Sequence, residues 1–333
     1  MHILVIGGAG YIGSHVVKAL LDKGMRVTVF DNLSTGLKIN FFEKAEYVVG
    51  DILNYDEIAS AMQKNVDGVV LLAAKKAVGE SMSFPEKYAL NNISGTINVL
   101  NAMSAHNVKN LVFSSSAAVY GMPEYLPIDE QHPLNPINFY GFTKYDMEKY
   151  FEWYDRLKGI KYVSLRYFNA VGYDEDGDVR GLEKNPQNLL PIVMETAVGI
   201  REKMQIFGND YDTRDGTCIR DYIHVTDLAA AHIAALDFLS RKQQSEIFNL
   251  GTETGISVLE MVNKTEELLG LKINYEFAPR RPGDPAVLTA SVGKARKVLG
   301  WTATHSSLEN IILSTWQAYK HCLLYTSPSP RDS

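Results

Sequence analysis

The first 31 residues carry the pattern that most restricts the fold of this 333-residue chain. Residues 2–6 are mostly apolar and rich in β-branched side chains, which predicts a short buried strand. They lead into Gly-Gly-Ala-Gly-Tyr-Ile-Gly at positions 7–13, and a segment with apolar side chains at helical spacing follows. A second short apolar segment at 26–30 ends in Asp31. Strand, glycine-rich turn, helix and strand in this order predict one βαβ unit of about 30 residues.

The glycines and the acid of this unit suit a dinucleotide. Glycines permit a tight turn and let the backbone approach a pyrophosphate, while the N-terminus of the following helix attracts the phosphates. Asp31 lies 18 residues after Gly13, where it can accept hydrogen bonds from an adenosine ribose and would repel a 2′-phosphate. The competing interpretation is a structural glycine turn, but the ordered succession of all five features favours a site for NAD rather than NADP.

Strands and helices continue to alternate through the first half of the chain. Further strands are predicted at 47–50, 68–74, 110–116 and 162–167, with helices between them that include a long helical region after Pro85. This alternation is typical of an α/β fold with a doubly wound parallel Rossmann sheet, in which ligands bind beyond the carboxyl ends of the strands. The residues expected at those ends are Asp31, Asp51, Ala73, Ala74, Ser114, Ser116, Phe168 and Asn169.

The second half of the chain is less regular. A helix is expected to open at 188–191, a strand at 204–207, and a helix at 226–238 with Thr226 as its N-cap. Residues 248–250 are expected to return to the main sheet, and Ser257 with Glu260 has the spacing of a capping box at the start of a further helix. His224 lies in an apolar, strand-like segment and is predicted to be structural.

These elements predict two interleaved domains. The NAD-binding Rossmann domain is expected at 1–169, with 220–251 returning to it, and a smaller C-terminal α/β substrate domain at 170–219 and 252–320. Residues 323–333 are rich in Ser and Pro and have no periodicity, so we expect them to be a disordered or non-native tail.

A tyrosine and a lysine provide the candidate chemistry. Tyr140 and Lys144 are four residues apart near the start of a predicted helix, so they lie on one face. A nearby cation favours a phenolate, which makes Tyr140 a candidate general base. The same spacing recurs at Tyr145/Lys149 and Tyr154/Lys158, so spacing alone is weak evidence, and packed tyrosines with solvated lysines are the alternative. Only the first pair follows a proline-containing loop, at the end of the helix expected to face the cleft.

Charge and cysteine content narrow the partners. The net charge is −6 with no basic block, so neither nucleic acid nor an anionic membrane is an expected partner. The two cysteines, Cys218 and Cys322, are far apart without metal-ligand spacing, so we expect no metal and a cytoplasmic location. The first strand starts almost at Met1, which leaves no room for a signal peptide, and no apolar run could span a bilayer.

Taken together, these motifs resemble the extended short-chain dehydrogenase/reductase family, and within it the epimerases that act on UDP-hexoses. The resemblance covers residues 1 to about 318 and includes Tyr-Gly-x-Thr-Lys at 140–144 and the serine-rich segment at 114–121. More specific matches are the segments 76–81, 91–92, 166–169, 215–217, 220–225, 248–251 and 280–284.

The resemblance implies an enzyme that inverts C4 of a UDP-hexose through a 4-keto sugar, with NAD as cofactor and a homodimer built on helices near 85–106 and 143–158. The implied catalytic residues are Tyr140, Lys144 and Ser116. The implied NAD-binding residues are Gly7, Gly10, Tyr11, Ile12, Gly13, Asp31, Asn32, Asp51, Ile52, Leu72, Ala73, Ala74, Lys76, Asn91, Ser114, Tyr140, Lys144 and Phe168. The implied substrate-binding residues are Ser116, Tyr140, Asn169, Asn188, Leu189, Arg220, Arg281 and Asp284.

Three alternatives share this fold. A sugar-nucleotide 4,6-dehydratase needs an added Asp-Glu pair after the serines, where this chain has Ala117-Ala118. A 4-epimerase for a UDP-uronic acid or a UDP-N-acetyl sugar stays open, because Leu288 occupies a position where some members carry a bulkier tyrosine that crowds the N-acetyl group. A non-catalytic NAD-binding regulator tends to lose the tyrosine or the lysine, and both are present here.

Overall fold

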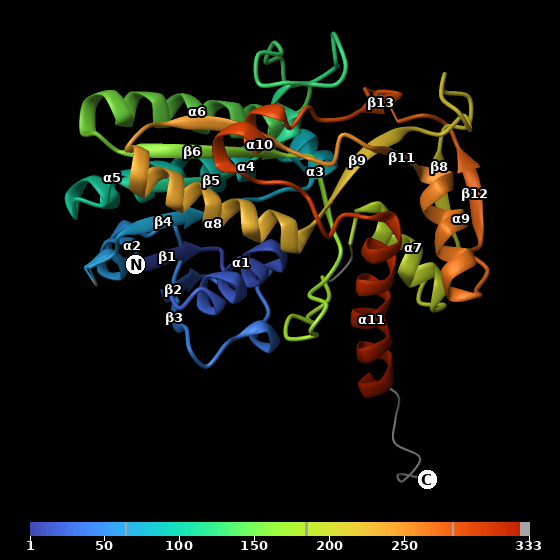
Figure 1. Ribbon diagram of the computed structural model, residues 1–333, viewed down its shortest axis with the longest axis horizontal. Coiled ribbons are helices and arrows are strands. Elements are labelled where there is room, and N and C mark those ends of the chain that lie inside the picture. The colour runs from blue at the N-terminus through green and yellow to red at the C-terminus, as the bar shows by residue number, and fades with distance from the viewer. Residues whose placement is uncertain (64, 184–185, 282, 327–333) are drawn as a thin grey trace.

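A seven-stranded parallel sheet forms the larger part of the molecule (Figure 1). The computed structural model describes residues 1–63, 65–183, 186–281 and 283–326. The strand order is β10-β6-β5-β4-β1-β2-β3, and all neighbouring pairs are parallel. The strands are β1 (His2–Ile6), β2 (Arg26–Asp31), β3 (Glu46–Val49), β4 (Gly68–Leu71), β5 (Asn110–Ser116), β6 (Lys161–Tyr167) and β10 (Glu246–Leu250). This confirms the predicted doubly wound Rossmann sheet.

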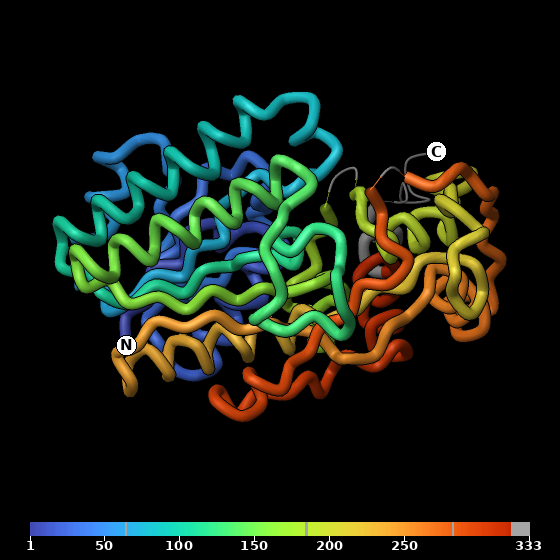
Figure 2. The backbone as a smooth tube through the Cα atoms, turned by 90° about the horizontal axis from the view of Figure 1, so that it is seen from above, coloured from blue at the N-terminus to red at the C-terminus, as the bar shows by residue number. Residues whose placement is uncertain are grey.

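Helices cover both faces of the sheet. The period-2 alternation of a strand sends Ile3 and Val5 of β1 into one core and Leu4 and Ile6 into the other. The first core lies under α1 (Tyr11–Asp22) and α8 (Val225–Lys242), which contact each other. The second lies under α2 (Tyr55–Met62), α5 (Gly95–Ala105) and α6 (Phe139–Lys158). Figure 2 shows α5 and α6 side by side along one face of the molecule.

The strand order reverses between β1 and β4, which makes this the topological switch point of the sheet. Strand β4 was predicted to continue to residue 74, and it ends at Leu71 instead. The reason is local: the backbone N–H groups of Leu72 and Ala73 both donate to the Ile6 oxygen, at 2.8 and 3.0 Å, so the chain leaves the ladder there. The segment after Leu71 is thereby held against the glycine-rich turn.

The remaining chain packs beside one end of this sheet (Figure 1). A four-stranded sheet consists of β7 (Asn169–Val171), β9 (Ile219–His224), β11 (Gly255–Ser257) and β13 (Val287–Leu288), and a two-stranded sheet of β8 (Met204–Phe207) and β12 (Tyr275–Ala278). Three helices pack on one another there: α7 (Leu189–Ala197), α9 (Val258–Leu269) and α11 (Leu308–Thr326). The short elements are α3 (Val78–Ser83), α4 (Pro85–Tyr88), α10 (Gly293–Leu299), the 3₁₀ turns η1 (Lys38–Asn40) and η3 (Ala117–Val119), and the π-helical segment η2 (Ala89–Ser94).

Two predicted helix caps can be compared with the structure. Both hydrogen bonds of the Ser257/Glu260 capping box are present, which confirms that prediction. The predicted cap of α8 was wrong: the cap is His224, whose Nδ1 accepts from the Thr226 N–H at 3.1 Å, because a histidine ring can replace a hydroxyl as acceptor. His224 is therefore structural, as predicted.

The C-terminal helix is longer than predicted. We expected a disordered or non-native tail at 323–333, but α11 continues to Thr326, because the chain keeps helix-compatible residues up to the proline at position 328. The rest of the predicted tail, 327–333, lies outside the described residues.

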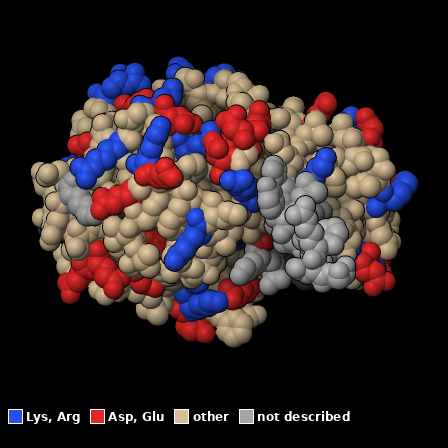
Figure 3. Space-filling view, turned by 90° about the horizontal axis from the view of Figure 1, so that it is seen from below, with Lys and Arg blue, Asp and Glu red and all other residues tan. Residues whose placement is uncertain are grey.

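Charged side chains of both signs are interspersed on the face in Figure 3. Within the described ranges, none of the helices combines the length and the apolarity that a bilayer-spanning segment needs.

Candidate active site

The glycine-rich turn joins β1 to α1 and leaves the N-terminus of α1 without a side-chain cap. Gly7 has a φ of +85°, and a Cβ on it would lie 2.6 Å from the Ala73 nitrogen. A Cβ on Gly13 would lie 2.2 Å from the Gly7 oxygen. Gly10 is the N-cap of α1, so Tyr11 and Ile12 begin the helix without a side-chain cap from that position. Because the first N–H groups of a helix have no partner within it, this turn fits a pyrophosphate.

Acids stand at the ends of β2 and β3, beside this turn. Asp31 accepts from the Ala9 N–H at 3.0 Å and the Leu33 N–H at 2.8 Å. Burial raises the pKa of Asp31, although these two hydrogen bonds oppose the rise. Asn32 donates to Asp51 at 2.9 Å, so the two strand ends are linked. The predicted ribose-binding acid is thus fixed next to the glycine turn, as a dinucleotide site requires.

The segments after β3 and β4 line the next part of the site. Ile52 is buried and its carbonyl accepts from Asn98. Ala73 and Ala74 follow β4, and Lys76 forms an ion pair with Glu183 of the second half of the chain.

Asn92, which was not among the predicted site residues, supports the segment after β4. Asn92 is fully buried, accepts from the Lys75 N–H at 2.8 Å and donates to the Thr143 hydroxyl at 3.0 Å. Asn91, which was predicted, is half-buried and donates to Asn92. Asn92 thereby ties the loop after β4 to α6. The sequence feature that could have identified Asn92 is a polar side chain within a predicted helical region.

Tyr140 occupies the second position of α6. Asn138 caps the helix by accepting from the Gly141 N–H at 2.8 Å, and the Tyr140 N–H donates to Ser81 at 3.1 Å. Gly141 lets the helix approach η3, since a Cβ there would lie 2.4 Å from the Ala118 oxygen. The Ser116 side chain hydrogen-bonds the Tyr140 side chain and also accepts from the Ala118 N–H. The predicted catalytic tyrosine and serine are therefore in contact.

Lys144 lies one turn further along α6, inside the protein. Its Nζ is 5.9 Å from the centre of the Tyr140 ring and 4.6 Å from that of Phe113. It donates to the Ser114 carbonyl at 2.7 Å. Burial lowers the pKa of Lys144 to about 7, although the nearby Glu148 opposes this shift.

The pKa of Tyr140 is raised rather than lowered, contrary to the effect expected of Lys144. Burial raises the pKa of Tyr140, and the hydrogen bond from Ser116 only partly opposes that rise. The physical reason is that both groups are desolvated, so burial outweighs the cation. The two other Tyr/Lys pairs differ: Lys149 pairs with Glu152 at 2.7 Å near the surface, and Tyr154 donates to Asn101.

The predicted substrate residues lie where the second half of the chain meets the sheet. Asn169 begins β7, follows the buried Phe168, and donates to the Asp221 carbonyl at 3.0 Å. Asn188 is the N-cap of α7, and Leu189 is the first residue of that helix. A small cavity brings Asn188 together with Tyr11, Glu183 and the segment 170–173. Tyr11 also donates to the Gly172 carbonyl, so the predicted NAD and substrate regions adjoin.

The predicted diphosphate-binding arginines already have partners. Arg220 forms an ion pair with Asp284 and donates to the Ile219 carbonyl. The guanidinium of Arg281 lies 3.8 Å from the centre of the Phe207 ring, a contact that the sequence reading missed. Leu288 is the register partner of Arg220 across β13 and β9, which places it beside this group.

The glycine turn at the switch point, the acid that ends β2 and the Tyr140–Ser116–Lys144 cluster between β5 and α6 define a dinucleotide-dependent enzyme of the Rossmann class. Residues 3–251 match the model of the NAD dependent epimerase/dehydratase family, and the chain belongs to this family.

Individual relatives cover nearly the whole chain. The UDP-glucose 4-epimerase of Lactobacillus helveticus is 46% identical over 322 residues, which are 96% of this chain and 97% of the relative. The UDP-glucose 4-epimerase of Streptococcus mutans serotype c is 47% identical, and the match covers 95% of this chain and 96% of the relative. The crystal structure of UDP-glucose 4-epimerase from Brucella ovis in complex with NAD has a TM-score of 0.93 and 41% identity, covering 96% of this chain and 98% of that one.

Proposed function

We propose that this protein catalyses the NAD-dependent 4-epimerisation of UDP-hexoses, UDP-glucose and UDP-galactose, through a transient 4-keto sugar. The single observation that carries the proposal is the cluster of half-buried Tyr140 and Ser116 with buried Lys144 where β5 meets α6, in a chain that belongs to the epimerase/dehydratase family. The glycine turn and Asp31 supply a fitting cradle for NAD, which accepts a hydride from the sugar and returns it when bound.

In the proposed mechanism Tyr140 removes the proton of the 4-hydroxyl as the C4 hydrogen leaves as hydride. Ser116, hydrogen-bonded to Tyr140, holds the 4-oxygen and relays its proton. Lys144, when protonated, would favour the phenolate by its charge and would help to hold the nicotinamide ribose. The 4-keto sugar then turns about its diphosphate link and receives the hydride on its other face, and Tyr140 returns the proton.

The proposed substrate contacts hold the nucleotide rather than the sugar, which leaves the hexose free to turn. Arg220 and Arg281 would bind the diphosphate, since arginine makes forked bonds to phosphate. Asp284 would accept from the uridine ribose, and Asn169, Asn188 and Leu189 would complete the site. The stacking of Arg281 on Phe207 leaves its edge N–H groups available to a phosphate, and Arg220 is oriented by its pair with Asp284.

Two alternatives are separated from this proposal by particular residues. A 4,6-dehydratase needs acids after the serines, where η3 consists of Ala117, Ala118 and Val119. Acceptance of UDP-N-acetyl sugars depends on the space beside Leu288. A cytoplasmic location, which we also propose, agrees with the buried free thiol of Cys218.

The proposal is tested by incubating the purified protein with UDP-galactose and, separately, with UDP-N-acetylgalactosamine, without added cofactor. We expect proton NMR to show conversion of UDP-galactose to its 4-epimer, because each cycle regenerates the NAD. The ratio of the two rates ranks the sugars. No conversion of either sugar, even with added NAD, would reject epimerisation of these sugars and favour the regulator.

We further propose that the protein is a homodimer in which α5 and α6 pack against their copies. The outer face of α6 exposes 56% of Trp153 and 71% of Leu157, and Phe142 at its start is 42% exposed. Trp153→Glu is expected to halve the molar mass in light scattering from twice 37.1 kDa, because a charge at the centre of an apolar interface is desolvated without a partner. Ile200→Glu, on a similarly exposed apolar residue outside these helices, should leave the dimer intact. A wild-type mass of one chain would contradict the proposal.

A further inference from the structure

A buried ion pair lies directly behind the Tyr140/Lys144 pair. The side chains of Glu148 and Arg166 are 1% and 2% exposed, and Nη2 of Arg166 is 2.6 Å from Oε2 of Glu148. Arg166 Nε donates to Oε1 of the same carboxylate at 3.1 Å, and the Ser115 hydroxyl donates to Oε1 at 2.6 Å. The carboxylate is thus fully hydrogen-bonded and held in one position.

Chain geometry places this carboxylate next to Lys144. Glu148 follows Lys144 by four residues on α6, so the two side chains lie on one face of the helix. They also contact successive residues of β5, since Lys144 donates to the Ser114 carbonyl and Glu148 accepts from the Ser115 hydroxyl. Arg166 is the register partner of Ser115 across β5 and β6. The three charges therefore form one layer between the helix and the sheet.

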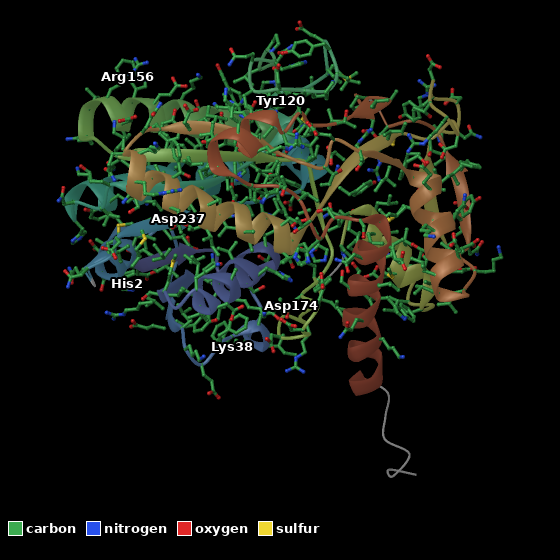
Figure 4. All side chains as sticks on the ribbon, viewed as in Figure 1. His2, Lys38, Tyr120, Arg156, Asp174 and Asp237 are labelled. Atoms are coloured by element: carbon green, nitrogen blue, oxygen red, sulfur yellow. The ribbon has the colours of Figure 1, made fainter. Side chains whose placement is uncertain are left out.

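The guanidinium is held by Tyr120 as well as by Glu148. Arg166 Nη1 donates to the Tyr120 hydroxyl at 3.0 Å, and Tyr120 donates to Asn249 at 2.6 Å. Tyr120 lies where the loop region between β5 and α6 meets the sheet (Figure 4). Asn249 of β10 also donates to the Ile128 carbonyl. This network holds the arginine against Glu148, whose charge also acts on Lys144.

We infer that Glu148 is a positioning residue for catalysis that acts through Lys144: its buried carboxylate, fixed by Arg166 and Ser115, keeps the lysine protonated behind Tyr140. A lysine that has lost water on all sides favours its neutral form, and a neutral lysine no longer stabilises a phenolate. One fixed negative charge in the same layer opposes that loss. Arg166 partly offsets the stabilisation of the protonated lysine by Glu148, because the positive charge of Arg166 repels that of Lys144.

The other ionisable groups around Lys144 are neutral near pH 7 or belong to the reaction. His232 of α8 donates from Nδ1 to the Leu228 carbonyl, so its Nε2 accepts from the Ser114 hydroxyl at 2.9 Å. Burial lowers the pKa of His232 to about 4, so it adds no charge near neutrality. The tyrosines near this layer are Tyr120 after η3, Tyr140 of α6 and Tyr167 of β6, and burial raises the pKa of each. Glu148 is therefore the charge that decides the state of the lysine.

The inference rests on the proposed epimerase function and is tested by the pH profile of kcat/KM for UDP-galactose. Glu148→Gln should move the basic limb of the profile to lower pH by on the order of one unit, because the lysine loses its counter-charge. Arg166→Gln should move it to higher pH, because the repelling cation is gone. Ser115→Ala, which removes one hydrogen bond of the same network and no charge, should leave the limb in place.

A merely structural pair gives a different pattern. If the ion pair is only structural, Glu148→Gln and Arg166→Gln should both lower kcat and the melting temperature. The basic limb of the pH profile would then stay in place or move in the same direction in both variants, and either behaviour of the limb overturns the inference. If Glu148→Gln does not fold, the direction seen with Arg166→Gln decides alone. The titration of Lys144 can also be followed without turnover by NMR of protein labelled with ¹³C at lysine Cε, assigned with Lys144→Met. The same opposite shifts are expected there, so an inactive wild type would reject the proposed function without removing this test.

Discussion

Tyr140→Phe is expected to lower kcat for UDP-galactose by about 10²–10⁴-fold, the range that a positioned general base contributes. The substitution removes only the hydroxyl that contacts Ser116. The ring keeps its place, because Asn138 caps the helix and Ser81 accepts from the residue 140 N–H. Binding of NAD and of UDP should therefore change little, since neither depends on proton transfer. The measurements are steady-state kinetics, the NAD content of the purified protein and calorimetric titration with UDP.

The chain contains its own control for this prediction. Tyr145 and Lys149 have the same spacing on the same helix, and the Lys149 ammonium lies 5.4 Å from the centre of the Tyr145 ring. Lys149 is 43% exposed and pairs with Glu152, so this pair is half-solvated. Tyr145→Phe should keep kcat within about twofold of wild type, as expected for a position outside the reacting groups. Equal kcat in Tyr140→Phe and Tyr145→Phe would refute Tyr140 as the base.

Local patterns explain why so much of the first half could be predicted. The strand at 2–6, the glycines at 7–13 and the acid at 31 are consecutive in sequence, and each has one physical role in a βαβ unit. The strand at Asn110–Ser116 was predicted to the residue, because it is a short apolar segment that ends in serines.

Contacts between distant residues could not be predicted in the same way. Glu148 looks in sequence like one more acid on a long polar helix, and only the register of β5 with β6 brings Arg166 to it. Arg281 and Phe207 meet although 74 positions separate them. The rise of the pKa of Tyr140 likewise depends on burial, which spacing does not report. The sequence identifies the candidate reacting groups, whereas their electrostatic surroundings follow from tertiary packing.

The cluster of Asp174, Asp176 and Asp178 is another contact that could not be predicted from sequence alone. Its carboxylate oxygens lie close enough together to suggest a cation site (Figure 4 labels Asp174). The Lys18 ammonium already lies 3.5 Å from Asp174 and 3.0 Å from Asp176. A lysine from α1 thus balances these acids and links the helix that follows the glycine turn to the segment after β7. The cluster therefore fixes α1 in position.

At Gly13, on the helix that this cluster contacts, one added methyl group should disturb the glycine turn directly. Gly13→Ala would place a Cβ 2.2 Å from the Gly7 oxygen and 2.8 Å from Gly8 Cα, both backbone atoms of the turn. The helix cannot move away freely, because Val16, Val17 and Leu20 are fully buried against the sheet and α8. The turn must therefore distort. We expect a loss of about 1–3 kcal/mol in the free energy of unfolding, as for other overpacked sites, and little NAD retained after purification.

The matched control is Gly293→Ala. Gly293 begins α10, and a Cβ there would have no neighbour within 4 Å. Alanine favours a helix over glycine by up to about 1 kcal/mol, so this variant should be as stable as wild type or slightly more stable, with its NAD content unchanged. Thermal unfolding and the NAD content of both variants measure the difference. If Gly13→Ala kept wild-type NAD content and melting temperature, the close approach of α1 to the turn would not be what the dinucleotide site requires, and the cradle would have to be assigned to the strand ends at Asp31 and Asp51 alone.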